Sequence, residues 1–153
     1  MTRWRRRGTL ACIVLAMAGL AAAADAPRVS NAWARATPPG ATVGAVYLRI
    51  EGGSTSDRLL GATSPRAQRV ELHAVDASAG MSRMRPADGV DIPPGAHVEL
   101  APQGLHLMLL GLESPLRAGE SLPLLLRFER GGEAAIEVEV RSATAGDGSG
   151  AHH

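Results

Sequence analysis

The stretch Leu105-His106-Leu107-Met108-Leu109-Leu110 alternates leucine with other side chains, as a strand with one buried face does. Successive side chains of a strand point to opposite faces, so Leu105, Leu107 and Leu109 are expected to face the core. His106 and Met108 then lie together on the other face. The stretch therefore predicts a β-sheet that presents an imidazole and a thioether side by side.

Strand-like runs of this kind recur along the rest of the chain. They are separated by turn formers such as Thr37-Pro38-Pro39-Gly40 and Pro93-Pro94-Gly95. No amphipathic run is long enough for a central helix, and Pro123 disfavours a helix in the apolar residues 122–126. The pattern predicts a single all-β domain, a sandwich or barrel. The expected strands are residues 29–35, 44–51, 58–63, 69–75, 81–85, 97–100, 105–110, 121–129 and 134–141.

The first residues have the features of a secretory signal peptide. Four arginines between residues 3 and 7 precede an apolar run over residues 9–20, and residues 21–24 are all alanine, with cleavage expected after Ala24. The apolar run is shorter than the roughly 20 residues of a membrane-spanning helix, which disfavours the alternative of an uncleaved anchor. We expect a periplasmic protein with residues 1–24 as signal peptide, 25–141 as the β-sandwich domain and 142–153 as a flexible tail.

Without this leader the composition excludes several classes of function. The leader takes 4 of the 16 basic residues and none of the 15 acidic ones, which leaves 12 against 15 and a net charge near −3. No basic patch remains for nucleic acid, and aromatic residues are too few for a base-stacking platform. The one cysteine, Cys12, lies in the leader without a good lipoprotein signal around it. The exported chain is therefore expected to have neither thiol nor disulfide.

The methionines after the leader are clustered. Met81, Met84 and Met108 lie in one segment, residues 81–108, with His73 shortly before it and His106 within it, whereas methionines that fill cores are usually scattered. Thioether and imidazole are soft, neutral ligands that select Cu(I) over Mg, Ca or Mn. Without cysteine, a blue-copper centre and a cysteine-type zinc site are excluded. We therefore predict one Cu(I) bound by His73, Met84, His106 and Met108, with Met81 as a candidate auxiliary ligand.

Other interpretations stay open from the residues alone. A lone His–Met pair on a strand is more often ordinary packing, and a plain sandwich for adhesion or assembly would suit the same strands. An enzyme is disfavoured, because hydrolytic metal sites need a general base and Glu71 is the single carboxylate placed with the cluster. His97 alternates as a surface residue. His152 and His153 end the tail, where they offer at most weak binding of Cu(II).

The four candidate ligands have the spacing His-x10-Met-x21-His-x-Met, and here the sequence resembles the periplasmic copper chaperone family often called PCuAC. Flanking stretches such as Val70-Glu71-Leu72-His73 and Met84-Arg85-Pro86 match as well, and the resemblance covers about residues 28–141. Many members carry a further methionine close after the first histidine, where this chain has Ala74 and Val75.

The resemblance implies a cupredoxin-like, Greek-key β-sandwich that holds Cu(I) near its surface with those four side chains. It further implies a non-enzymatic carrier that supplies the CuA centre of cytochrome c oxidase, alongside a Sco-type thiol protein. We expect a monomer with no nucleic-acid partner and, after cleavage, no membrane attachment. The alternative is a periplasmic copper buffering or resistance protein without a dedicated acceptor.

Overall fold

The computed structural model describes residues 25–76 and 80–145, in which strands are the regular elements. The predicted signal peptide with Cys12, and the tail residues His152 and His153, lie outside this described part. No helix within it has the length and apolar character that crossing a bilayer requires. The strands are β1 (Arg28–Arg35), β2 (Val43–Glu51), β3 (Asp57–Thr63), β4 (Ala67–Asp76), β5 (Arg83–Pro86), β6 (Val90–Ile92), β7 (His97–Leu100), β8 (His106–Leu112), β9 (Ser121–Phe128) and β10 (Gly132–Arg141).

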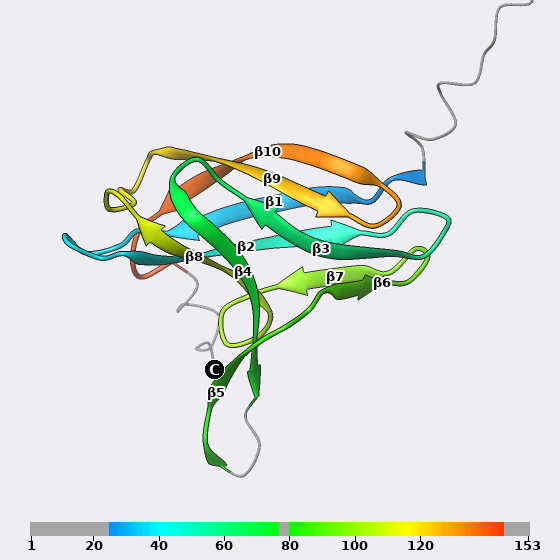
Figure 1. Cartoon of the computed structure of the whole chain (residues 1–153), viewed down its shortest axis with the longest axis horizontal. Coiled ribbons are helices and arrows are strands. Elements are labelled where there is room, and N and C mark those ends of the chain that lie inside the picture. The colour runs from blue at the N-terminus through cyan, green and yellow to red at the C-terminus, as the bar shows by residue number, and fades with distance from the viewer. Residues whose placement is uncertain (1–24, 77–79, 146–153) are drawn as a thin grey trace, which may run out of the picture.

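These strands form one sheet that closes on itself (Figure 1). Neighbours follow the order β5-β4-β8-β2-β1-β10-β9-β3-β6, and β7 pairs with β2. A further pairing of β3 with β4, at Ala62 and Val70, joins the strands next to the two ends of this path and closes the sandwich. β1 and β10 pair in parallel, and the other pairs among the described strands are antiparallel. The predicted all-β sandwich is confirmed.

Each predicted strand agrees with an observed one to within two residues at either end. The predicted strand 81–85 begins at Arg83, because β5 pairs with β4 from Asp76 opposite Arg83 onward. The short strand β6 was not predicted, since its three residues lie between Gly89 and Pro93 and give too little alternation to recognise. Pro123 lies in β9 and not in a helix, as expected.

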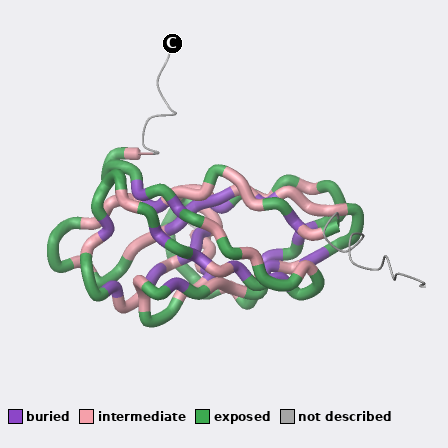
Figure 2. The backbone as a smooth tube through the Cα atoms, turned by 90° about the horizontal axis from the view of Figure 1, so that it is seen from above, coloured by how far each residue is buried: buried purple, intermediate pink, exposed green. Residues whose placement is uncertain are grey.

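The core is mostly aliphatic, with Phe128 as its aromatic member among the described residues, and buried positions recur along the strands (Figure 2). Leu107 and Leu109 of β8 are fully buried, as their alternation with His106 and Met108 predicted. Burying a leucine side chain contributes about 1.5–3 kcal/mol, so these two residues fix the register of β8 and hence the face of its other side chains. The core thereby sets which side His106 and Met108 occupy. The other fully buried large side chains are Val46, Leu48, Ile50, Leu59, Ile92, Leu100, Leu116, Leu122, Leu124 and Leu126.

Candidate metal centre

Pairing between β4 and β8 brings three of the four predicted ligands together. His73 lies directly opposite His106, and Glu71 directly opposite Met108. Side chains that are directly opposite on paired strands share one face of the sheet. The two imidazole centroids lie 6.0 Å apart, with the ring planes at 44°. Two rings that share one ion through bonds of about 2 Å lie at about this separation.

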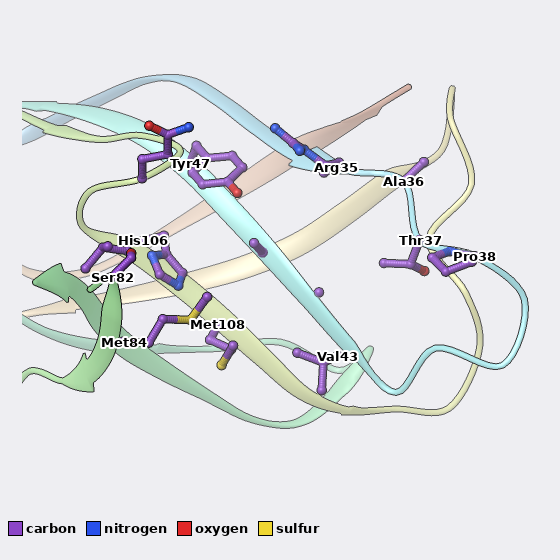
Figure 3. Close-up of a pocket in the computed structure, with 14 residues that line it drawn as sticks. Arg35, Ala36, Thr37, Pro38, Val43, Tyr47, Ser82, Met84, His106 and Met108 are labelled. Carbon is purple, nitrogen blue, oxygen red and sulfur yellow. The ribbon is translucent and has the colours of Figure 1, made fainter. Parts of the chain in front are cut away.

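The fourth predicted ligand, Met84, comes from β5. Its Cα partner is Val75, two residues beyond His73 on the same face of β4. Met84 is 60% exposed, yet it lines the same cavity of about 470 Å³ as His106 and Met108. Figure 3 shows the Met84 and Met108 thioethers beside the His106 ring at this opening. The site is therefore open to solvent on the side of Met84.

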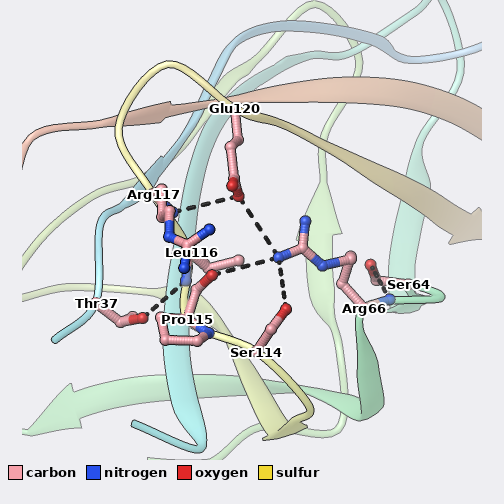
Figure 4. Close-up of polar contacts among 8 residues, drawn as sticks. All are labelled: Thr37, Ser64, Arg66, Ser114, Pro115, Leu116, Arg117 and Glu120. Carbon is pink, nitrogen blue, oxygen red and sulfur yellow. Dashed lines mark hydrogen bonds and ion pairs between the residues drawn. The ribbon is translucent and has the colours of Figure 1, made fainter. Parts of the chain in front are cut away.

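The opposite wall of the cavity was not predicted from the sequence. It includes Thr37 and Pro38 of the loop after β1, together with Tyr47 of β2. Two hydrogen bonds of 2.9 Å join Thr37 to Leu116. The Thr37 N–H donates to the Leu116 carbonyl oxygen, and the Leu116 N–H donates to Thr37 Oγ1, the second of which Figure 4 shows. Leu116 is fully buried, so this wall is anchored to the core. Arg66 reinforces the neighbouring loop through Ser114, Pro115 and Glu120.

His106 is held by a tight loop. Backbone hydrogen bonds from Ala101 to the Leu105 carbonyl and from Gly104 to the Ala101 carbonyl close the turn that leads into β8. The Gly104 carbonyl oxygen lies 3.1 Å from His106 Nδ1. Because a carbonyl oxygen only accepts, Nδ1 carries the proton in the neutral ring, and Nε2 keeps a lone pair for an ion. The ring is 5% exposed and lies 6.4 Å from the Tyr47 ring.

In His73 the other ring nitrogen makes the contact, because Nε2 lies 2.9 Å from Glu71 Oε2. Its Nδ1 is buried and has no hydrogen-bond partner among the described residues. A buried polar atom without a partner is costly unless a ligand engages it. The hydrogen bond with His73, and then that with Arg69, hold the pKa of Glu71 below its usual range. These donors therefore suit a soft cation, which would bind the lone pair of His73 Nδ1.

Three candidates do not line the cavity. His73 is half-buried on β4 opposite His106, Met81 is 55% exposed, and His97 is exposed on β7. Within residues 25–76 and 80–145, no group of three or more histidine, cysteine, aspartate or glutamate side chains is arranged to hold an ion. Soft donors at this cavity besides His106 are the sulfurs of Met84 and Met108.

Residues 28–140 match the family described as "Putative lipoprotein LpqE-like". A relative from Leifsonia xyli subsp. xyli, putative lipoprotein Lxx21020, is 35% identical and aligns over 92% of this chain and 91% of its own. Among solved structures, the copper-bound PCuAC domain from PmoF2 has a TM-score of 0.66 at 26% identity, over 76% of this chain and 92% of its own.

A second solved structure covers nearly the whole sequence. Apo-DR1885 from Deinococcus radiodurans has a TM-score of 0.60 at 26% identity, over 93% of this chain and 94% of its own. The CuI form of DR1885 is 29% identical, with a TM-score of 0.59 over 72% of this chain and 74% of its own. The chain therefore belongs to the LpqE-like family, and its cupredoxin-like fold is that of the PCuAC domains that its sequence resembles.

Proposed function

We propose that this protein is a copper chaperone that binds one Cu(I) outside the cytoplasm and passes it to an acceptor protein. The observation that carries the proposal is that two thioethers and one imidazole, from β5 and β8, line one opening, while a second imidazole on β4 lies directly opposite the first. These are His73, Met84, His106 and Met108. The similarity to copper-bound PCuAC domains supports copper as the cargo.

The chemistry of the four side chains favours Cu(I) among the common cations. All four are soft and neutral, so they suit a soft monovalent ion and leave hard divalent ions poorly bound. Without a thiolate, binding is expected to be releasable. Met84 is the most exposed of the four ligands, so an incoming ligand from an acceptor would reach the ion on its side. An open site of this kind suits transfer better than permanent storage.

Export is supported by the signal-like leader and by the description of the family and the Leifsonia relative as lipoproteins. We propose a periplasmic location with cleavage after Ala24. The acceptor is proposed to be the CuA subunit of cytochrome c oxidase or a Sco-type thiol protein, both of which offer thiolates that bind Cu(I) more tightly than thioethers do. Buffering without an acceptor is the competing function.

An anaerobic Cu(I) titration of the exported chain, residues 25–153, against a competing chelator tests binding. We expect one Cu(I) per chain. Met84→Leu combined with Met108→Leu removes both sulfurs at nearly constant volume and should weaken binding by about 100-fold or more, equivalent to about 2.8 kcal/mol.

Matched controls are Met81→Leu and His97→Asn, which change an exposed methionine and an exposed histidine away from the cavity. Both should bind as the parent does. Failure of the parent to bind at micromolar Cu(I), or equal losses in Met81→Leu and in the double variant, would contradict the proposed site.

Deletion of the gene separates a carrier from a buffer. A carrier for the CuA centre predicts low oxidase activity at limiting copper, restored by the parent gene and not by the double methionine variant. Normal oxidase activity combined with greater copper sensitivity would instead support buffering.

A further inference from the structure

Glu71 contacts a predicted ligand but lies outside the ligand set. We infer that it is a positioning residue, which holds His73 in the Nε2-protonated tautomer, so that His73 presents Nδ1 to the ion while His106 presents Nε2. The inference rests on the proposed function, because it concerns the same site. It adds a residue and a coordination mode that the spacing of the ligands does not contain.

Two contacts of the Glu71 carboxylate carry the inference. Glu71 and His73 are two residues apart on β4, so they share a face, and Glu71 Oε2 lies 2.9 Å from His73 Nε2. The other carboxylate oxygen, Oε1, accepts a hydrogen bond of 2.6 Å from Arg69 Nε. The carboxylate is thus held from two sides. A carboxylate only accepts, so the proton of the neutral His73 ring lies on Nε2.

The unprotonated nitrogen of His73 is then Nδ1. Nδ1 is buried and has no hydrogen-bond partner among the described residues, on a side chain that is 12% exposed. A ring rotated to present Nε2 to an ion would break the contact with Glu71 and leave a charged oxygen without its donor. That loss opposes rotation. The ring is therefore oriented before any ion arrives.

His106 shows the opposite arrangement. There the fixed acceptor is a backbone carbonyl, that of Gly104, and the protonated nitrogen is Nδ1. The two histidines thus differ in which nitrogen is free, and each assignment comes from a partner other than the ion. Such partners typically change metal affinity by about 10–100-fold when removed.

Nitrogen-15 NMR of the exported apo-protein at about pH 8, where unperturbed histidine is neutral, tests the tautomers directly. We expect the proton of His73 on Nε2 and that of His106 on Nδ1. On loading with Cu(I), which is diamagnetic, the coordination shift should appear at His73 Nδ1 and His106 Nε2. A shift at His73 Nε2 would overturn the inference.

Substitution tests the role of Glu71. Glu71→Ala should give His73 a mixture of tautomers and weaken Cu(I) binding by about 10–100-fold. Glu71→Gln keeps one oxygen acceptor for the two donors, Arg69 Nε and His73 Nε2, so it should retain the Nε2 proton and the affinity only in part, between Glu71→Ala and the parent. The matched control is Glu139→Ala, which removes a carboxylate from a similar pair, Glu139 with Arg141, that has no histidine.

The outcomes separate this inference from the proposed function. Unchanged His73 tautomer and affinity in Glu71→Ala, with normal binding by the parent, would overturn the positioning role and leave the copper site intact. If instead the parent bound no Cu(I), the proposed function would fail and the coordination mode with it, whatever tautomer the apo-protein showed.

Discussion

Met81 and Met84 are both exposed and three residues apart, yet their surroundings differ. Met84 lines the cavity with His106 and Met108, whereas Met81 does not. Exposure alone predicts that both react readily with a thioether reagent, ahead of the half-buried Met108. Their difference should appear when a soft ion occupies the lone pairs of the sulfurs that bind it.

Thioether labelling with an oxaziridine, read by mass spectrometry, measures this difference. Without metal we expect Met81 and Met84 to be labelled fastest. Ag(I), a soft ion that replaces Cu(I) without its redox chemistry, should slow labelling of Met84 and Met108 and leave Met81 unchanged. Met81 is an internal control within the same chain, and equal protection of all three methionines would contradict the site.

Some contacts between individual residues could be predicted from the sequence, and others could not. His106 and Met108 share a face because a strand has a period of two residues, which is local information. The placement of His73 opposite His106 depends on the pairing of β4 with β8, which local alternation does not determine. The shared face of Glu71 and His73 was recognisable, but their contact was not. Nothing in the sequence indicated that Tyr47 lies near His106.

Among the elements, the start of β3 depends on one buried carboxylate. Burial raises the pKa of Asp57, but hydrogen bonds from the backbone N–H groups of Arg130, Arg58 and Gly131 outweigh it and hold the pKa below 3.8. The three distances are between 2.7 and 2.9 Å. Asp57 therefore joins β3 to the turn between β9 and β10.

We expect Asp57→Ala to lower the free energy of unfolding by about 1–3 kcal/mol at neutral pH, because it leaves backbone donors without an acceptor. A lowered pKa in the folded state stabilises the protein above the unfolded pKa and loses this effect as pH falls through the folded value. The difference in free energy of unfolding between parent and variant, measured by urea denaturation, should therefore become smaller below about pH 4.

The matched control is Asp91→Ala, since Asp91 is 78% exposed and pairs only with the Arg58 side chain among the described residues. Its effect should be below about 1 kcal/mol. A cost as large as that of Asp57→Ala would contradict the assignment of the stabilisation to the backbone hydrogen bonds.

The length of a strand decides whether the sequence alone could predict it. Strands such as β7 and β10 were predicted because alternation over several residues separates them from loops. β6 has three residues and owes its strand geometry to pairing with β3, at Asp57–Ile92, Arg58–Asp91 and Leu59–Val90. β5 owes its position to β4 in the same way. Tertiary pairing, and not local propensity, decides such short strands.

For the whole molecule, the core and the candidate site are separate. Leucines of β8 are buried inside the sandwich, while His106 and Met108 lie on the other face of the same strand. We therefore expect the fold to form without a bound ion, unlike small domains that fold only around a metal.

We expect the apo-protein to unfold cooperatively, with a circular dichroism spectrum unchanged by chelator. Because Cu(I) binds the folded state, it should raise the free energy of unfolding by about 2.7 kcal/mol when the free ion is at 100 times its Kd. The variant with both Met84→Leu and Met108→Leu should match the parent without copper and gain nothing from it. An apo-protein that is unfolded would contradict the separation of core and site.

Three of the proposed ligands lie on strands that have neighbours on both sides, but Met84 does not. It lies on β5, which pairs only with β4 among the described strands and projects from the sandwich (Figure 1). Fraying of this short hairpin arm would withdraw one sulfur while the remaining three donors stayed in place. The coordination number would then fall without global unfolding, so the residence time of the ion would be governed by the opening rate of β5.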